Sequence, residues 1–153
     1  MSRVFRHILE LLVQLSAKFI ITPPTNRVHS HIATNPKFSP FFNKCLGALD
    51  GIHIPAHKTA AYQNRKGFLS QNVLAACDFN MKFTYLRVGW EGTAHDARVL
   101  DDARSKDFPI PEGHFYLADA GYGLDWGILV PYRGTWYHLR EQAAAGQRYM
   151  GSL

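Results

Sequence analysis

Two apolar segments of this sequence each carry an aspartate that is followed closely by a glycine. The first is CLGALDGIHI at residues 45–54, and its Asp50 is the only acid between Glu10 and Asp78. A carboxylate in an apolar strand is costly to desolvate unless it is paired, hydrogen-bonded or bound to a cation. We therefore interpret Asp50 as functional. The alternative is that Asp50 ends its strand and caps a turn at Gly51, but the apolar residues beyond that glycine indicate that the strand continues.

Asp119 repeats this pattern after the mostly apolar run at residues 114–118, and Ala-Gly-Tyr-Gly follows it. This places the aspartate at the carboxyl end of a predicted core strand, with a glycine turn behind it. Ligands gather at such strand ends in α/β sheets. The alternative is an aspartate that only opens a turn, which is common in Asp-x-Gly sequences.

Apolar periodicity and turn residues predict the order of the elements. The apolar spacing predicts an amphipathic helix over residues 3–20, and prolines predict an irregular connector over residues 22–43. Asp and Asn residues predict a hairpin turn at residues 78–82, and Thr93 is typical of a helix N-cap, with Asp96 as its capping partner. The predicted strands cover residues 45–54, 69–77, 83–90, 114–118 and 128–132. The order is therefore strand, hairpin, helix, strand and short strand.

Composition and charge narrow the class of protein. With 153 residues, of which 46% are hydrophobic, the chain suits one domain with a buried core. Residues 1–77 hold nine Lys/Arg and two acids, a net charge of +7, whereas residues 78–153 hold eight Lys/Arg and ten acids, a net charge of −2. A basic half favours an anionic partner such as nucleic acid, and the alternative is a basic surface with no partner. No apolar run approaches the roughly 20 residues that span a bilayer, so no membrane association is expected.

Asp50 and Asp119 on neighbouring strands could together hold a divalent metal ion such as Mg²⁺, with water and phosphate as further ligands. A third carboxylate usually completes such a site, and Asp96 competes for that role. The capping interpretation explains Asp96 without catalysis, and we favour it. His53 and His95 do not match a zinc pattern, and we expect both to lie on the surface or to support the site.

Four blocks of sequence carry a family resemblance. They lie at residues 45–55 (CLGALDGIHIP), 62–67 (YQNRKG), 92–100 (GTAHDARVL) and 116–133 (YLADAGY with LVPYR). In this order they resemble Harbinger-type transposases and their domesticated nuclease relatives, over about residues 1–141. The resemblance implies an α/β, RNase H-like mixed sheet with flanking helices.

The same resemblance implies a function and its residues. The family cuts and joins DNA with an Asp-Asp-Glu set and divalent metal, Mg²⁺ or Mn²⁺, and Asp50 and Asp119 match the two aspartates. Asp96 matches a supporting position, and we place His53 and His95 with it. Arg65 and Lys66, in a polar loop, are the predicted contacts to DNA. A separate DNA-binding partner protein and a nuclear location are further expectations.

Two departures from the family pattern stand out. Position 52 is Ile where relatives usually carry Thr. The family glutamate has no match, because Asp125 and Glu141 are the only acids after Asp119 and Glu141 comes too early, without the surrounding motif. We therefore expect a nuclease domain that is C-terminally incomplete and cleaves poorly, and the alternative is a non-catalytic module that binds nucleic acid or a partner. The expected divisions are a helix and connector at 1–43, a partial endonuclease domain at 44–141 and a disordered tail at 142–153.

Overall fold

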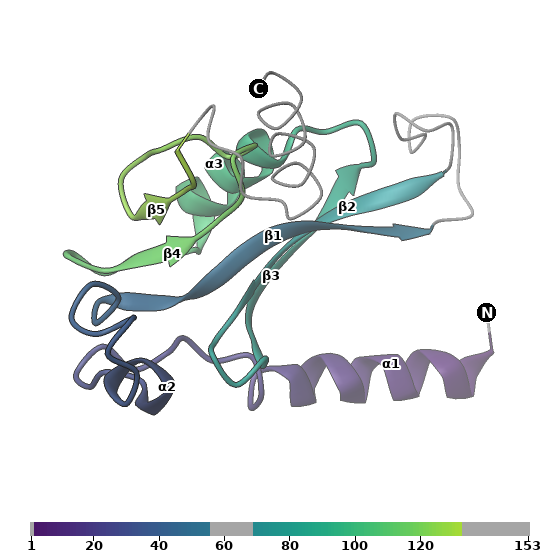
Figure 1. Ribbon diagram of the computed structural model, residues 1–153. Coiled ribbons are helices and arrows are strands. Elements are labelled where there is room, and N and C mark those ends of the chain that lie inside the picture. The colour runs from purple at the N-terminus through teal and green to yellow at the C-terminus, as the bar shows by residue number, and fades with distance from the viewer. Residues whose placement is uncertain (1, 56–68, 133–153) are drawn as a thin grey trace, which may run out of the picture.

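The computed structural model describes residues 2–55 and 69–132. Five strands form one mixed sheet, and α3 lies on one side of it while α1 and α2 lie on the other (Figure 1). No helix in these ranges has the length and apolar character needed to cross a membrane. The elements are α1 (Arg3–Ser16), α2 (Ser30–Ala33), β1 (Cys45–Pro55), β2 (Ser70–Cys77), β3 (Phe83–Glu91), α3 (Asp96–Lys106), β4 (Phe115–Leu117) and β5 (Ile128–Leu129).

The strand order in the sheet is β3-β2-β1-β4-β5. The central strand β1 runs antiparallel to β2 and parallel to β4, and β2 and β3 form an antiparallel pair. In the hairpin turn between β2 and β3, Asp78 Oδ1 accepts hydrogen bonds from the backbone N–H groups of Asn80 and Lys82, at 2.9 and 3.0 Å. The α/β, RNase H-like mixed sheet is therefore confirmed, although β4 and β5 are shorter than the predicted strands.

The core lies between the sheet and α3. Val99, Leu100 and Ala103 form the buried face of α3, and they belong to one cluster with Leu49 of β1 and Leu74 of β2. Burying such side chains stabilises the fold by roughly 1.5–3 kcal/mol each. This packing holds the first turn of α3 close to the centre of the sheet.

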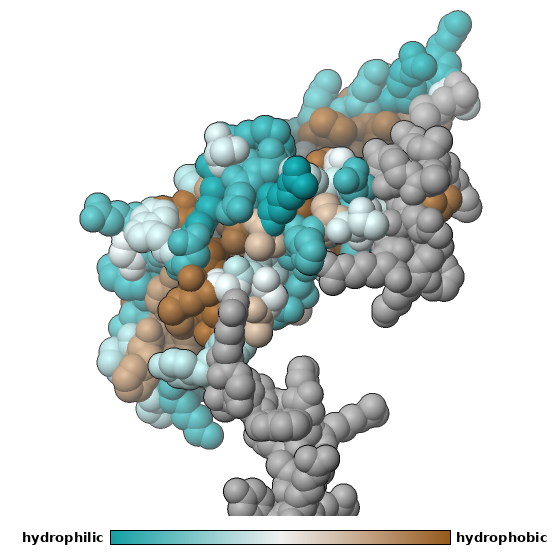
Figure 2. Space-filling view, turned by 90° about the horizontal axis from the view of Figure 1, so that it is seen from above, coloured by the Kyte–Doolittle hydropathy of each residue, from teal (hydrophilic) through white to brown (hydrophobic). Residues whose placement is uncertain are grey.

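The N-terminal region differs from the prediction in two places. Helix α1 begins as predicted but ends at Ser16, because the chain leaves the helix in tight turns in which Lys18 N–H donates to Leu15 C=O. The predicted irregular connector contains the short helix α2, which is capped because His29 Nδ1 accepts a 3.2 Å hydrogen bond from the His31 backbone N–H. No residue of α1 is buried, so its apolar side chains add to the apolar surface of the molecule (Figure 2).

Asp102 on α3 ties the helix to β3 and gives a prediction for the pH dependence of stability. Its carboxylate contacts Lys106 Nζ at 2.9 Å and Arg87 of β3 at 2.8 Å. Lys106 first, and then Arg87, hold the pKa of Asp102 below its ordinary value. A lowered folded-state pKa adds stability above the unfolded pKa of about 4, and that stability is lost as the pH falls through the folded pKa.

We therefore expect Asp102→Asn to lower the melting temperature at neutral pH and to flatten its decline below about pH 4. The control is Asp101→Asn, the same charge change at the neighbouring exposed position of α3. Thermal unfolding followed by circular dichroism at several pH values measures both effects. Identical pH profiles for Asp102→Asn and the wild type would contradict the role of this ion pair.

Candidate active site

The register of the sheet brings Asp50 and Asp119 to the same edge. In the parallel pair of β1 and β4, Ala48 lies opposite Leu117, where β4 ends. Asp50 follows two residues later on β1, and Asp119 follows two residues beyond the end of β4. Because the two strands run in the same direction, both carboxylates leave the sheet at the carboxyl end of β4. This is the place at which α/β sheets bind their ligands.

Each of these carboxylates is fixed through one oxygen. Asp50 Oδ1 accepts a 2.7 Å hydrogen bond from the Gly51 N–H, and Asp119 Oδ1 accepts a 2.9 Å hydrogen bond from the Gly121 N–H. Within the described ranges, no hydrogen bond or ion pair reaches the Oδ2 atom of either residue. The backbone therefore orients both carboxylates and leaves one oxygen of each available.

The expectation that Asp50 is buried in its strand is wrong. Strand β1 continues to Pro55, as predicted, but Asp50 is exposed because it lies with exposed Ala48 on the face of β1 opposite to that of buried Leu49. Asp119 does open a turn, since its C=O accepts from the Tyr122 N–H at 3.3 Å. Turn formation and an available carboxylate oxygen therefore occur together at Asp119.

The capping interpretation of Asp96 is also wrong. The N-cap of α3 is His95, Asp96 is the first helical residue, and no side-chain hydrogen bond caps the helix. Asp96 Oδ1 instead accepts a 2.8 Å hydrogen bond from Asn72 Nδ2 of β2, whose amide also donates to the Ala94 C=O at 3.0 Å. The buried amide of Asn72 turns the Asp96 carboxylate toward the sheet, away from the N–H groups of its own helix.

This orientation of the Asp96 side chain places its carboxylate beside β1. A methyl group built at Gly51 would lie 2.3 Å from Asp96 Oδ1, so only glycine leaves room for the carboxylate there. Gly51 directly follows Asp50, so the acid of α3 packs against the backbone of β1 at the residue after Asp50, although successive residues of a strand face opposite sides of the sheet. We call Asp50, Asp96 and Asp119 the carboxylate site.

The buried hydroxyl of Tyr122 lies within electrostatic reach of all three acids. Its side chain is buried and its hydroxyl has no hydrogen-bond partner among the described residues. Burial raises the pKa of Tyr122, and the negative charges of Asp96, Asp50 and Asp119 raise it further. All three members of the carboxylate site therefore act electrostatically on one hydroxyl.

The two predicted supporting histidines lie on the elements that carry the site. His53 is exposed on β1, opposite Asn72 in the register, and its Nδ1 lies 3.3 Å from Ser70 Oγ. His95 precedes Asp96 and is exposed at the start of α3, where its C=O accepts from the Val99 N–H at 3.1 Å. Neither histidine contributes to the electrostatic effect on Tyr122.

The donor set of the carboxylate site suits a hard divalent cation held by few protein ligands. No Lys or Arg within residues 2–55 and 69–132 forms an ion pair with these three acids. In the same ranges, no three His, Cys, Asp or Glu side chains lie close enough together to hold one ion. Mg²⁺ often binds through one or two carboxylates and keeps several waters, so a pair of aspartates fits it.

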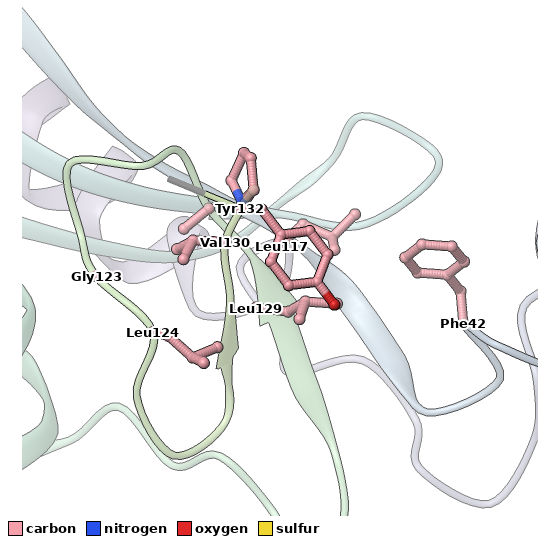
Figure 3. Close-up of a pocket in the computed structure, with 9 residues that line it drawn as sticks. Phe42, Leu117, Gly123, Leu124, Leu129, Val130 and Tyr132 are labelled. Carbon is pink, nitrogen blue, oxygen red and sulfur yellow. The ribbon is translucent and has the colours of Figure 1, made fainter. Parts of the chain in front are cut away.

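A large pocket adjoins the carboxylate site but has a different character. Its volume is about 940 Å³, and β4, β5 and the loop after Tyr122 form its walls (Figure 3). The lining residues are Phe42, Leu117, Ala118, Gly123, Leu124, Leu129, Val130, Pro131 and Tyr132. This lining offers no carboxylate or ring nitrogen, so the pocket itself is no metal site.

Some predicted residues cannot be placed, and two residues were missed. Arg65, Lys66 and Glu141 lie outside the described residues. No role was predicted for Asn72 or Tyr122. A polar amide inside the apolar strand β2 was a visible signal for Asn72, because asparagine is uncommon in buried strands.

A comparison with known protein families identifies the family of this chain. A model of the DDE superfamily endonucleases matches residues 49–150, about two thirds of the chain. The chain belongs to this family. Its matched region includes the whole carboxylate site, and nucleases of the superfamily generally use divalent metal ions. No curated protein and no solved structure was found to match the chain.

Proposed function

We propose that this DDE endonuclease-family chain is a Harbinger-type nuclease domain that cleaves phosphodiester bonds in nuclear DNA with Mg²⁺ or Mn²⁺. The proposal assigns the metal ligands to Asp50 and Asp119. The observation that carries it is the parallel register of β1 and β4, since it brings both aspartates to one edge with an Oδ2 atom of each available. The family match supports a nucleic-acid substrate.

The residues of the chain would orient the reaction in two ways. Gly51 N–H and Gly121 N–H hold Oδ1 of the two aspartates, so that Oδ2 of each can bind a cation. The negative charge of Asp96, held by Asn72, adds to the attraction for a cation at this edge. A divalent cation bound there supplies charge stabilisation at the phosphate and an activated water.

We also infer slow chemistry, because the sequence has no match for the family glutamate. Two-metal cleavage needs carboxylates that fix both ions. Within the described part of the chain, no three acidic, histidine or cysteine side chains lie close enough together to hold one ion. A misplaced ion can lower the rate on the order of 100-fold. The second candidate function is therefore a non-catalytic module that binds DNA through its basic half, through Arg65 and Lys66 among others, or that binds a separate DNA-binding protein.

A plasmid-nicking assay with Mg²⁺ or Mn²⁺ tests the proposed function. We expect slow nicking by the wild type and none by Asp50→Asn, because the substitution removes a charged ligand but keeps the shape of the side chain. The control Asp101→Asn changes the same charge on the exposed surface of α3 and should nick like the wild type. Nicking that survives in Asp50→Asn would contradict the proposed site, and its absence in every protein would favour the binding module.

A further inference from the structure

The hydroxyl of Tyr122 is buried without a hydrogen-bond partner in the described part of the chain. The side chain is 7% exposed and belongs to the core cluster that also contains Leu49 of β1 and Val99 of α3. Leu49 directly precedes the first aspartate of the carboxylate site, and Val99 lies one helical turn after the aspartate of α3. Tyr122 therefore sits where the elements that carry the carboxylate site meet.

A hydroxyl in this position has an energetic cost. Burying it without a hydrogen bond loses the bonds that it makes to water, and buried polar groups in native proteins are nearly always satisfied. A phenylalanine would fill the same space without that loss. Among the described residues, the Tyr122 hydroxyl therefore lacks the partner that its burial requires.

The position of Tyr122 indicates which kind of partner it has. Its backbone N–H donates to the Asp119 C=O at 3.3 Å, so the residue lies in the turn that follows the second aspartate of the carboxylate site. A tyrosine hydroxyl is protonated at neutral pH and can donate a hydrogen bond. The Oδ2 atoms of the carboxylate site are acceptors that nothing in the described ranges engages. Like charges on neighbouring carboxylates repel, and a divalent cation bound between them would offset that repulsion.

We propose that Tyr122 is a positioning residue of the carboxylate site, whose hydroxyl donates to one of these Oδ2 atoms once a divalent cation has drawn the carboxylates together. This inference rests on the proposed function, since it requires a metal ion at the site. Hydrogen bonds to the carboxylates that hold a metal ion fix their orientation, and losing one typically costs 10–100-fold in metal affinity.

The test compares Tyr122→Phe with the wild type by Mn²⁺ calorimetry and by thermal unfolding without metal. We expect Mn²⁺ affinity to fall about tenfold or more. Without metal, we expect the melting temperature to stay the same or to rise, because the substitution removes an unsatisfied hydroxyl. A residue with only a structural role would show the opposite pattern, with a lower melting temperature and an unchanged affinity.

Tyr85→Phe is the matched control. Its hydroxyl donates to Asp107 Oδ1 at 2.6 Å, between β3 and the end of α3. Removing this satisfied hydroxyl should lower the melting temperature and leave Mn²⁺ affinity unchanged.

The outcomes separate this inference from the proposed function. If the wild type binds Mn²⁺ and Tyr122→Phe binds it equally well, the inference is wrong and the metal site stands. If the wild type binds no Mn²⁺, the proposed function is wrong and the inference falls with it. If Tyr122→Phe does not fold, 3-fluorotyrosine labelling of the seven tyrosines allows the test in the wild type. There, Mg²⁺ should shift a tyrosine ¹⁹F signal, and binding without any such shift would overturn the inference.

Discussion

Mn²⁺ affinity is expected to fall by at least about 100-fold in Asp50→Asn and in Asp119→Asn, because each substitution removes a charged metal ligand. Losing a hydrogen bond to such a ligand already costs about 10–100-fold in metal affinity, and losing the ligand's charge should cost more. Asparagine keeps a side-chain oxygen that can accept from the Gly51 or Gly121 N–H, as the aspartates do at 2.7 and 2.9 Å. The local backbone should therefore survive, and the loss of affinity reports the missing charge. Isothermal titration calorimetry measures it directly.

Asp101→Asn controls for the change in net charge. Asp101 is exposed on α3, and within the described ranges it makes no ion pair. Its substitution should leave Mn²⁺ affinity within a few-fold of the wild type, since exposed charges are screened by salt. Equal Mn²⁺ binding by the wild type and both site variants would show that the register of β1 and β4 does not create a metal site.

The fold and the two leading aspartates could be predicted from the sequence because their signals are local. Each strand is an apolar run bounded by turn residues, and a family resemblance supplied their arrangement. Asp50 and Asp119 stand out because each is an acid beside an apolar run with a glycine behind it. Their meeting also depends on the register in which Ala48 lies opposite Leu117, and no local pattern contains that register.

Asp96 shows why other features could not be predicted. Thr93 and Asp96 have the spacing of a capping box, which is a preference of the isolated segment. In the folded chain, the amide of Asn72, 24 residues earlier, binds Asp96 Oδ1 and changes its orientation. Tyr122 could not be predicted for the same reason. Its hydroxyl becomes buried, with no partner among the described residues, only after β1, α3 and the Asp119 turn have packed together.

Gly47 gives the largest expected effect on stability. This glycine lies in the irregular stretch of β1 beside β4, and β1 approaches the end of β2 closely there. A methyl group built at Gly47 would lie 1.9 Å from the Cys77 carbonyl oxygen, 2.9 Å from its carbon and 3.2 Å from Asp78 Cα. All three are backbone atoms, so no side-chain rotation can relieve the overlap, and the strands must separate.

We therefore expect Gly47→Ala to lower the free energy of unfolding by at least about 3 kcal/mol, the upper end of the usual range for overpacked cores. Gly113→Ala is the matched control, because Gly113 has a φ of 72° but nothing within 4 Å of an added methyl group. Backbone strain alone should cost that control about 1–2 kcal/mol. Urea unfolding with equal slopes measures both losses on one scale.

Equal losses in the two variants would mean that the close approach of β1 to Cys77 adds nothing beyond the backbone conformation. A larger loss in Gly47→Ala would show that this contact helps to fix the strand on which Asp50 follows three residues later.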